Sequence, residues 1–403
     1  MTKSIKKQDF NLCSTIIIGP GYPLRGGISE SNQALQKSFI KENINCEIIS
    51  YSLQYPSILF PGKTQIVDSQ NNIVSNTINL INTLNPISWF RTVRYIMRNK
   101  PTFIIVRYWH PYFAICLGLI CKMLKRKNLF IVGWIDNVDP HEKFPFQKQM
   151  NSFFFNSCDA FVVMSQTVKK KIDQYQFSKP KKVLVSPHPI YNIFGPSISK
   201  KIARKRIGID STDKNDKYIL FFGLIRKYKG LDLLLEVMNS KKIRDMKIKL
   251  IIAGEFYENK NKYLEKIKSL KLEKSILIQD SYIPNEDVVN YFCAVDIVVQ
   301  PYLSATQSGV SMIAYNFDKP ILLTNVGGLS EYVEHNKNGY LVDVNHEQIS
   351  TALEDFYTNG KEKEFSDVIR KKKKLYTWKN LVDSFSQLRD EGLIDDTRLP
   401  IDD

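Results

Sequence analysis

Short apolar strands alternate with helical segments along the whole chain, and this alternation limits the possible folds more than any other feature. It is typical of βαβ units, which form parallel sheets. In the first half, strands are predicted at Thr15–Ile18, Cys46–Tyr51, Phe103–Arg107, Leu129–Trp134, Ala160–Met164 and Val183–Ser186. In the second half, they are predicted at Tyr218–Phe222, Lys249–Ala253, Ser275–Ile278, Ile297–Gln300 and Ile321–Thr324. Helices are predicted between them, for example at Gly27–Lys41, Gln166–Tyr175 and Tyr263–Leu270. The sequence therefore predicts an α/β protein.

The length of 403 residues is too great for one ordinary core and suits two domains. Three prolines and a glycine interrupt the pattern between Ser186 and Lys201, as in an interdomain hinge. The expected parts are a first Rossmann-like domain (1–187), a hinge (188–200), a second Rossmann-like domain (201–378) and a C-terminal helix (about 379–403) that packs back on the first domain. Doubly wound domains bind ligands at the carboxyl ends of their strands, so we expect the site in a cleft between the two domains.

The net charge of +16 is concentrated in one half of the chain. Residues 1–200 contain 25 Lys or Arg and 10 Asp or Glu, whereas residues 201–403 contain 32 and 31. The first half should therefore meet an anionic partner. No aromatic-basic RNA signature or helix-turn-helix pattern is visible, so an anionic membrane surface or a lipid diphosphate is favoured over nucleic acid.

Several classes of protein are disfavoured by what the chain lacks. Residues 1–13 have no apolar core of a secretory signal, and the apolar stretch from Pro111 to Leu124 is shorter than the roughly 20 residues that span a bilayer. The six cysteines form no CxxC pair, which favours reduced core cysteines in a cytoplasmic protein. There is no HExxH, Walker A or GxSxG motif, and the five histidines are scattered. Neither a metal nor a cofactor is expected.

The loop after the strand Tyr218–Phe222 carries the strongest functional signal. It delivers Arg226 and Lys229 just before Gly230 opens a helix. Two cations at the carboxyl end of a strand, beside a helix N-terminus, predict an anion site of phosphate size. Such cations stabilise the charge that develops on a departing diphosphate. Two merely exposed basic residues remain the alternative.

Other strand-end loops supply further candidates for binding a phosphate, a base or a sugar. Gly26 and Gly27 would let backbone N–H groups approach a ligand, although a simple tight turn is the alternative. The remaining candidates on the donor side are Glu255, Tyr257, Tyr282, Ile283, Gln307, Ser308, Gly309 and Glu331.

Polar loops after two strands of the first half are candidates for the acceptor side. Asp136 or His110 could position an acceptor hydroxyl, with loop capping as the structural alternative, and Asn137 and His141 lie in the same loop as Asp136. His188, between two prolines of the hinge, is interpreted as structural.

The segment Ile87–Arg98 is a basic amphipathic helix candidate. On a helical projection one arc holds Trp89, Phe90, Val93, Ile96 and Met97, and another holds Arg91, Arg94 and Arg98. Such a helix could lie on an anionic membrane surface, or it could pack its apolar arc on the core and leave a solvated basic face.

At these residues the sequence resembles the family 4 glycosyltransferases, and most closely a bacterial subgroup associated with capsule, exopolysaccharide or lipopolysaccharide synthesis. The matching motifs, in order, are GPGYPLRGGIS, SYSLQYPSILFPGKTQ, DNVDPHE, AFVVMS, PHPIYNIFG, FFGLIRKYKGLDLLL, AGEFY, QPYLSATQSGV and TNVGGLSEYV. The resemblance implies the GT-B fold and a retaining, metal-independent transfer from a nucleotide sugar. It also implies that Arg226 and Lys229 are diphosphate-binding cations and that Gly26 and Gly27 form the N-terminal glycine loop.

The chain departs from the family pattern at three places. Ile313 stands where the second of two glutamates is usual, and the first falls near Ala305 or Thr306. Leu224 stands where an arginine often follows the glycine of the strand, and Asp136 takes the place of an acceptor-side histidine. Gln307, Ser308 and Gly309 are expected to replace the missing contacts to the donor.

The expected function is the transfer of a hexose-type sugar from a nucleoside diphosphate to a lipid-linked or polysaccharide acceptor. We expect this in the cytoplasm, on the inner face of the membrane. A sugar phosphorylase or epimerase on the same fold is one alternative, and a membrane-associated assembly protein that has lost turnover is another.

Overall fold

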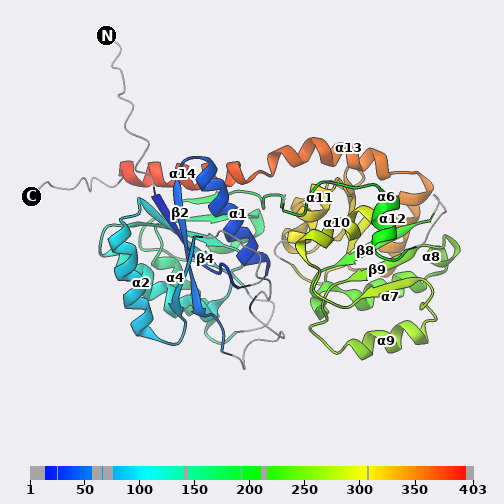
Figure 1. The fold of residues 1–403 in the computed structure, drawn as a ribbon, viewed down its shortest axis with the longest axis horizontal. Coiled ribbons are helices and arrows are strands. Elements are labelled where there is room, and N and C mark those ends of the chain that lie inside the picture. Colours follow the sequence, from blue (N-terminus) through cyan, green and yellow to red (C-terminus); the bar gives the residue numbers. More distant parts are fainter. Residues whose placement is uncertain are drawn as a thin grey trace, which may run out of the picture. The chain divides into compact units, whose positions relative to one another are not determined.

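The computed structural model describes residues 14–24, 26–56, 66, 76–139, 144–191, 193–209, 216–305 and 308–395. The chain divides into two compact units (Figure 1). The first unit comprises Met1–Pro187 and Trp378–Asp403, and the second comprises His188–Thr377. The division falls where the sequence analysis places the start of the hinge.

The first unit is built on a seven-stranded parallel sheet with the order β3-β2-β1-β4-β5-β6-β7. Its strands are β1 (Ser14–Ile18), β2 (Asn45–Leu53), β3 (Thr77–Asn82), β4 (Phe103–Tyr108), β5 (Phe130–Ile135), β6 (Ala160–Val163) and β7 (Val183–Val185). Its helices are α1 (Gly27–Lys41), α2 (Pro86–Asn99), η3 (Pro111–Phe113), α3 (Ala114–Lys125), α4 (Gln147–Asn156), α5 (Gln166–Ile172) and α14 (Trp378–Asp395).

The second unit is built on a six-stranded parallel sheet with the order β10-β9-β8-β11-β12-β13. Its strands are β8 (Tyr218–Phe222), β9 (Lys249–Ala253), β10 (Ile276–Gln279), β11 (Ile297–Gln300), β12 (Ile321–Thr324) and β13 (Gly339–Val342). Its helices are α6 (Lys200–Arg206), η4 (Lys227–Lys229), α7 (Leu231–Asn239), α8 (Lys241–Asp245), α9 (Lys260–Ser269), α10 (Asn285–Ala294), α11 (Gly309–Asn316), η5 (Gly327–Glu331), α12 (His346–Thr358), α13 (Glu362–Lys372) and η6 (Lys373–Leu375).

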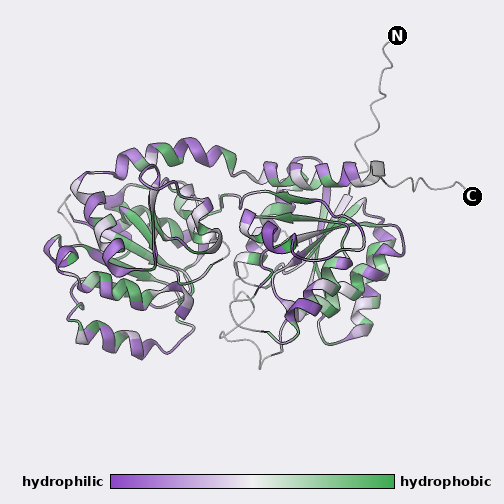
Figure 2. Cartoon of the chain, turned by 180° about the vertical axis from the view of Figure 1, so that it is seen from behind, coloured by the Kyte–Doolittle hydropathy of each residue, from purple (hydrophilic) through white to green (hydrophobic). Residues whose placement is uncertain are grey.

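Every predicted strand is present, and two strands were not predicted. The missed strands β3 and β13 are edge strands, and each is paired on one side only. The fold class is confirmed as α/β with two Rossmann-like sheets. Figure 2 shows hydrophobic strands inside each unit, covered by helices that carry polar residues on their outer sides.

Each face of the first sheet is covered by its own set of helices. Residues of α2, α3 and α4 pack on one face, where Trp89, Leu117 and Phe154 share a core. On the other face, Phe39 of α1 and Phe385 of α14 pack with Trp134 of β5. The C-terminal helix therefore completes the hydrophobic core of the first unit.

The described residues include five cysteines. Cys46, Cys116, Cys121, Cys158 and Cys293 are buried and form no disulfide. Among the helices of the described residues, none combines the length and the apolar character needed to cross a membrane.

In each sheet the strand order reverses beside the first strand. The chain runs outward from β1 to β3 and then returns to β4, and it runs from β8 to β10 and returns to β11. The loops that leave β1 and β4, and those that leave β8 and β11, therefore diverge at the carboxyl end of each sheet. Ligands of open α/β sheets bind at such switch points.

Replacing Phe385 by Ala tests the role of α14. The ring is fully buried and lies 5.8 Å from the ring of Trp134, centroid to centroid. Because truncation leaves a cavity, Phe385→Ala should lower the free energy of unfolding of the first unit by about 3–5 kcal/mol. Tryptophan fluorescence during urea unfolding reports this unit selectively, since all four tryptophans lie in it.

The exposed Gln387 on the same helix provides the control. Gln387→Ala should change the unfolding free energy by no more than about 0.5 kcal/mol. Equal stability of the Phe385→Ala variant and the wild type would show that α14 does not belong to this core.

Candidate functional site

The candidate site lies in the second unit, at the carboxyl ends of β8, β9 and β11. Three loops meet there, comprising residues 223–230 after β8, 254–259 after β9 and 301–308 after β11. β8 and β11 are neighbours at the switch point of the sheet, the place where open α/β sheets bind their ligands.

Glycines bring the backbones of these loops into direct contact. A Cβ on Gly230, whose φ is 71°, would lie 1.9 Å from the carbonyl oxygen of Pro301. A Cβ on Gly254 would lie 2.2 Å from the carbonyl oxygen of Gly223. The loops are also joined by a hydrogen bond, 2.7 Å long, from the Leu303 N–H to the carbonyl of Tyr228. Larger side chains at these glycines would force the loops apart.

Lys229 is a buried cation next to the start of α11. Lys229 is only 7% exposed. A Cβ on Gly223 would lie 3.0 Å from the Lys229 Nζ and 3.6 Å from the Val310 Cγ2, so the ammonium and the first turn of α11 lie on either side of Gly223. Among the described residues, no carboxylate forms an ion pair with Lys229.

Burial, and after it the charge of Arg226, lowers the pKa of Lys229 to about 7. Taking a charged group out of water is costly unless an opposite charge accompanies it. An anion in this loop would supply that charge. The electrostatics of Lys229 thus fit a site that is completed by an anionic ligand.

Arg226 is held beside Lys229 by the loop that follows β9. Its guanidinium carbon lies 5.0 Å from the centroid of the Tyr257 ring. The two loops run side by side, because Ile225 N–H donates to Glu255 O (2.9 Å) and Tyr257 N–H donates to Ile225 O (3.0 Å). Tyr257 therefore positions Arg226 by a cation–π contact.

Ser308, at the start of α11, forms a hydrogen bond within the protein. The hydroxyl of Ser308 donates to the Gln300 Oε1 at 2.6 Å, and the Gln300 Nε2 donates to the Ser311 Oγ at 3.1 Å. Ser308 thus fixes the turn through its side chain. Within the described part of the chain no side chain caps the N-terminus of α11, and the backbone N–H groups of its first turn are groups that can bind an anion. Gln307 lies outside the described residues.

The other predicted donor-side residues lie at the same edge of the sheet. Glu255 is buried at the exit of β9, and Tyr282 and Ile283 follow β10, the tyrosine exposed and the isoleucine buried. Glu331 is exposed at the end of η5, after β12. All of them follow the carboxyl ends of strands in the same sheet as Lys229 and Arg226.

The glycine loop of the first unit is open. Gly26, with a φ of 114°, precedes the first residue of α1, which is Gly27. A Cβ on either glycine would have no atom within 4 Å. Both residues are exposed at the carboxyl end of β1, as a ligand-binding loop requires.

Asp136 has a partner that the sequence analysis did not foresee. Its two carboxylate oxygens accept hydrogen bonds from the Arg107 Nε and Nη2, each 2.6 Å long, and the residue is only 4% exposed. The guanidinium carbon of Arg107 lies 3.4 Å from the centroid of the Trp134 ring. The structure thus gives Asp136 the role of fixing the ends of β4 and β5, in addition to any contact with an acceptor.

The remaining acceptor-side candidates are placed less closely together. The Nδ1 of His110 accepts the Tyr112 N–H at 3.1 Å, so this histidine caps η3, which is the structural alternative of the sequence analysis. Asn137 is half-buried next to Asp136, and His141 lies outside the described residues.

Three residues of the two switch points were not predicted. Tyr191 of the hinge segment packs on Gly309, since a Cβ on that glycine would lie 3.5 Å from its ring, and its hydroxyl lies 3.2 Å from the His188 Nε2. Gln300 organises Ser308, and Arg107 holds Asp136. Tyr191 and Gln300 lie inside quoted motifs and Arg107 ends a predicted strand, and these positions were the sequence signals for them.

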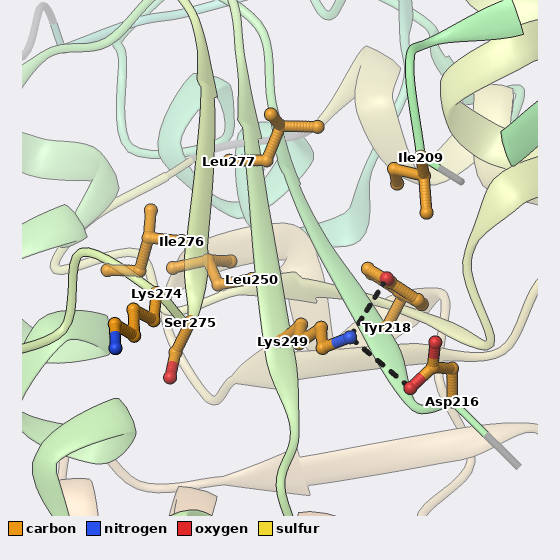
Figure 3. A pocket seen from close by; sticks show the side chains of 9 residues that line it. All are labelled: Ile209, Asp216, Tyr218, Lys249, Leu250, Lys274, Ser275, Ile276 and Leu277. Carbon is orange, nitrogen blue, oxygen red and sulfur yellow. Dashed lines mark hydrogen bonds and ion pairs between the residues drawn. The ribbon is translucent and has the colours of Figure 1, made fainter. Parts of the chain in front are cut away.

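In the part of the chain that the structure describes, no group of three or more His, Cys, Asp or Glu side chains could hold a metal ion. A hollow of about 290 Å³ lies at the opposite end of the second sheet, where Tyr218 begins β8, Lys249 begins β9 and Ile276 begins β10 (Figure 3). In it, Lys249 Nζ lies 3.3 Å from both an Asp216 carboxylate oxygen and the Tyr218 hydroxyl. This hollow is separate from the candidate site.

Comparison with known proteins identifies the type of domain. Residues 203–375 match the model of the family described as glycosyl transferases group 1. D-inositol 3-phosphate glycosyltransferase of Pseudarthrobacter chlorophenolicus is 30% identical over 155 residues, which cover 38% of this chain and 36% of that protein. An uncharacterised 41.2 kDa protein in the cps region of Klebsiella pneumoniae is 26% identical over 171 residues, 42% of this chain and 45% of that protein. The match to this family lies within the second unit.

Solved structures extend the similarity to both units. A glycosyltransferase from Rickettsia africae has a TM-score of 0.75 at 16% identity, covering 96% of this chain and 100% of that chain. Anabaena HepE, solved in complex with UDP, has a TM-score of 0.70 at 14% identity, covering 93% and 100%. At such identities the likeness establishes the fold, which is GT-B as predicted. The alignments with the curated relatives span less than half the length of those proteins.

The affinity of the site for a nucleoside diphosphate should fall as the pH rises above about 7. A bound diphosphate favours the charged form of Lys229 and so raises the pKa of that lysine from the value of about 7. Above this pH, binding must take up a proton, and the association constant for UDP should fall by up to about 10-fold per pH unit. Isothermal titration calorimetry from about pH 7 to about pH 9 measures this dependence.

The Lys229→Met variant is the matched control. It should bind UDP more weakly and without the fall in affinity over the same pH range. An equal pH dependence in the variant and the wild type would show that another group titrates.

Proposed function

We propose that the protein is a glycosyltransferase that moves a sugar from a nucleoside-diphosphate sugar to a lipid-linked or polysaccharide acceptor. The observation that carries the proposal is the pair of cations at the switch point of the second sheet, above all the buried Lys229 without a carboxylate partner among the described residues. The match of residues 203–375 to the group 1 glycosyl transferases supports it, as does the structural likeness to HepE, which was solved in complex with UDP.

The proposed chemistry is the departure of the nucleoside diphosphate from the anomeric carbon. As that bond breaks, negative charge grows on the leaving oxygen and spreads over the diphosphate. Arg226 and Lys229 stabilise this charge from fixed positions, and the first backbone N–H groups of α11 add to the stabilisation. Since Lys229 is shielded from water, its interaction with the leaving group is stronger than that of a surface lysine.

We propose that the rest of the donor is held by the surrounding loops. Gln307, Ser308 and Gly309 contact the phosphate and the sugar, while Tyr282 and Ile283 face the base. Glu255 and Glu331 complete the donor site. Ile313, in α11, supplies no carboxylate, so the transfer depends more heavily on the two cations.

The proposal also covers the acceptor side, the pathway and the location. The exposed loop at Gly26 and Gly27 contacts the donor, and Asp136, Asn137, His110 and His141 face the acceptor. The similarity to a protein from a cps region supports a role in polysaccharide synthesis. We propose a retaining transfer, without metal or other cofactor, in the cytoplasm at the inner face of the membrane.

Removing either cation should abolish most of the turnover. Arg226→Ala and Lys229→Ala should each lower kcat by about 100-fold or more, the size of one preorganised charge contact. The measurement uses membrane lipids from the producing cell as acceptors and a panel of labelled nucleotide sugars, with label in the lipid fraction as the readout.

Lys227 offers a control in the same loop. It is exposed and carries the same charge, so Lys227→Ala should leave kcat within about 3-fold of the wild type. Wild-type turnover in both the Arg226→Ala and Lys229→Ala variants would contradict the assignment. Release of a sugar phosphate that depends on inorganic phosphate would instead identify a phosphorylase.

Chelation should not affect the transfer. Because the charge of the leaving group is met by Arg226, Lys229 and α11, a large excess of EDTA should change the initial rate by less than about 2-fold. Loss of activity in EDTA that is restored by Mg²⁺ or Mn²⁺ would contradict metal independence. The anomeric configuration of the product, measured by NMR, tests retention.

A further inference from the structure

The exposed side of α2 differs from the amphipathic arrangement that the sequence predicted. Trp89 and Ile96 are buried in the core of the first unit. Phe90, expected on the same apolar arc, is instead 64% exposed. The apolar arc is therefore used for packing, as the structural alternative proposed, and cannot also lie on a membrane.

A second set of side chains forms the outer stripe of α2. Leu84, just before the helix, is exposed, as are Ile87 and Phe90 in its first turns. Arg91, Arg94 and Arg98 continue the same stripe toward the C-terminus, since spacings of three and four residues keep side chains on one side of a helix. We refer to these six residues as the α2 surface.

The charge of this part of the chain has one sign. From Ser69 to Ile135 the sequence contains nine Lys or Arg and no Asp or Glu. Among the described residues, none of the three arginines of the α2 surface forms an ion pair with a carboxylate. Glu47 of β2 accepts a hydrogen bond from Tyr95 of α2 at 3.0 Å.

The apolar part of the α2 surface lies at the carboxyl end of the strands of the first sheet. Because α2 follows β3 directly, its first turn lies at the carboxyl end of the parallel strands. The first turns of α3 and α4 lie at the same edge, and they expose Ile115 and Phe146. Large exposed apolar side chains therefore gather at the end of the unit where the loops after β1, β4 and β5 emerge.

We propose that the α2 surface docks the first unit on an anionic lipid bilayer, with Leu84, Ile87 and Phe90 inserted at the level of the headgroups. The three arginines would contact lipid phosphates. This inference deepens the proposed function, because it places the acceptor end of the sheet at the surface from which a lipid-linked acceptor would come.

Charge complementarity favours a bilayer over a protein partner. An interfacial helix binds through a buried apolar side and cationic side chains beside it, which is the composition of this stripe. Each arginine near an anionic surface contributes roughly a factor of 5 in affinity, and burying two large apolar side chains contributes a further factor of 10 or more. A protein that binds the same face would need a matching acidic surface.

Sedimentation with lipid vesicles tests the proposal without any need for transferase activity. The wild-type chain should sediment with vesicles of phosphatidylglycerol and phosphatidylcholine at low salt, and binding should weaken as salt is added. Arg91→Gln/Arg94→Gln/Arg98→Gln should weaken the partition coefficient by about 100-fold. Ile87→Ser/Phe90→Ser should weaken it by at least about 10-fold.

Matched variants remove the same groups elsewhere. Lys268→Gln/Lys271→Gln/Lys274→Gln removes three exposed charges from the second unit, and Ile40→Ser/Ile202→Ser removes two exposed apolar side chains. Both should bind vesicles within about 3-fold of the wild type. Unchanged UDP affinity in all four variants would show that the donor site is intact.

Failure of the wild type to bind anionic vesicles, or equal loss of binding in the matched controls, would overturn the proposal. Equal binding to pure phosphatidylcholine would overturn the role of the arginines. None of these results bears on the turnover of the Arg226 and Lys229 variants, so the failure of docking and the failure of the proposed function can be told apart.

Discussion

The second unit depends on one costly arrangement, the burial of the Lys229 ammonium without a carboxylate partner among the described residues. Desolvation lowers the pKa of this lysine to about 7, so near neutral pH the empty site carries a proton that is only weakly held. The same lysine would be a stable cation beside a diphosphate. The free energy needed to bury the charged ammonium is thus linked to ligand binding, because a bound diphosphate offsets it.

The backbone contacts of the surrounding loops explain how this cation is kept in place. Gly230 and Gly254 allow the loops after β8, β9 and β11 to touch, and Gln300 fixes the turn that begins α11. Arg226 is oriented in turn by Tyr257. In the first unit the ion pair of Arg107 and Asp136 instead fixes the ends of β4 and β5. One sheet therefore presents cations, whereas the other presents an open glycine loop.

The sequence predicted the central strands well, because buried parallel strands are continuous apolar runs bounded by glycine and polar residues. It missed β3, whose Thr77, Asn79 and Asn82 interrupt the apolar run, and β13, which begins with a glycine and has three apolar residues; both are edge strands with weaker patterns. The position of Arg226 and Lys229 between β8 and α7 was predictable because a strand, a loop and a helix are local features. The partner of Asp136 is 29 residues away, and the exposure of Phe90 depends on which side of α2 meets the sheet. Long-range packing of this kind leaves no local signal.

A crystal structure with bound UDP tests most directly whether a diphosphate binds at the switch point of the second sheet. We predict phosphate oxygens within about 3 Å of the Lys229 Nζ and the Arg226 guanidinium, with the first backbone N–H groups of α11 pointing toward them. A nucleotide bound with its phosphates away from both cations, for example at the carboxyl edge of the first sheet, would contradict the account.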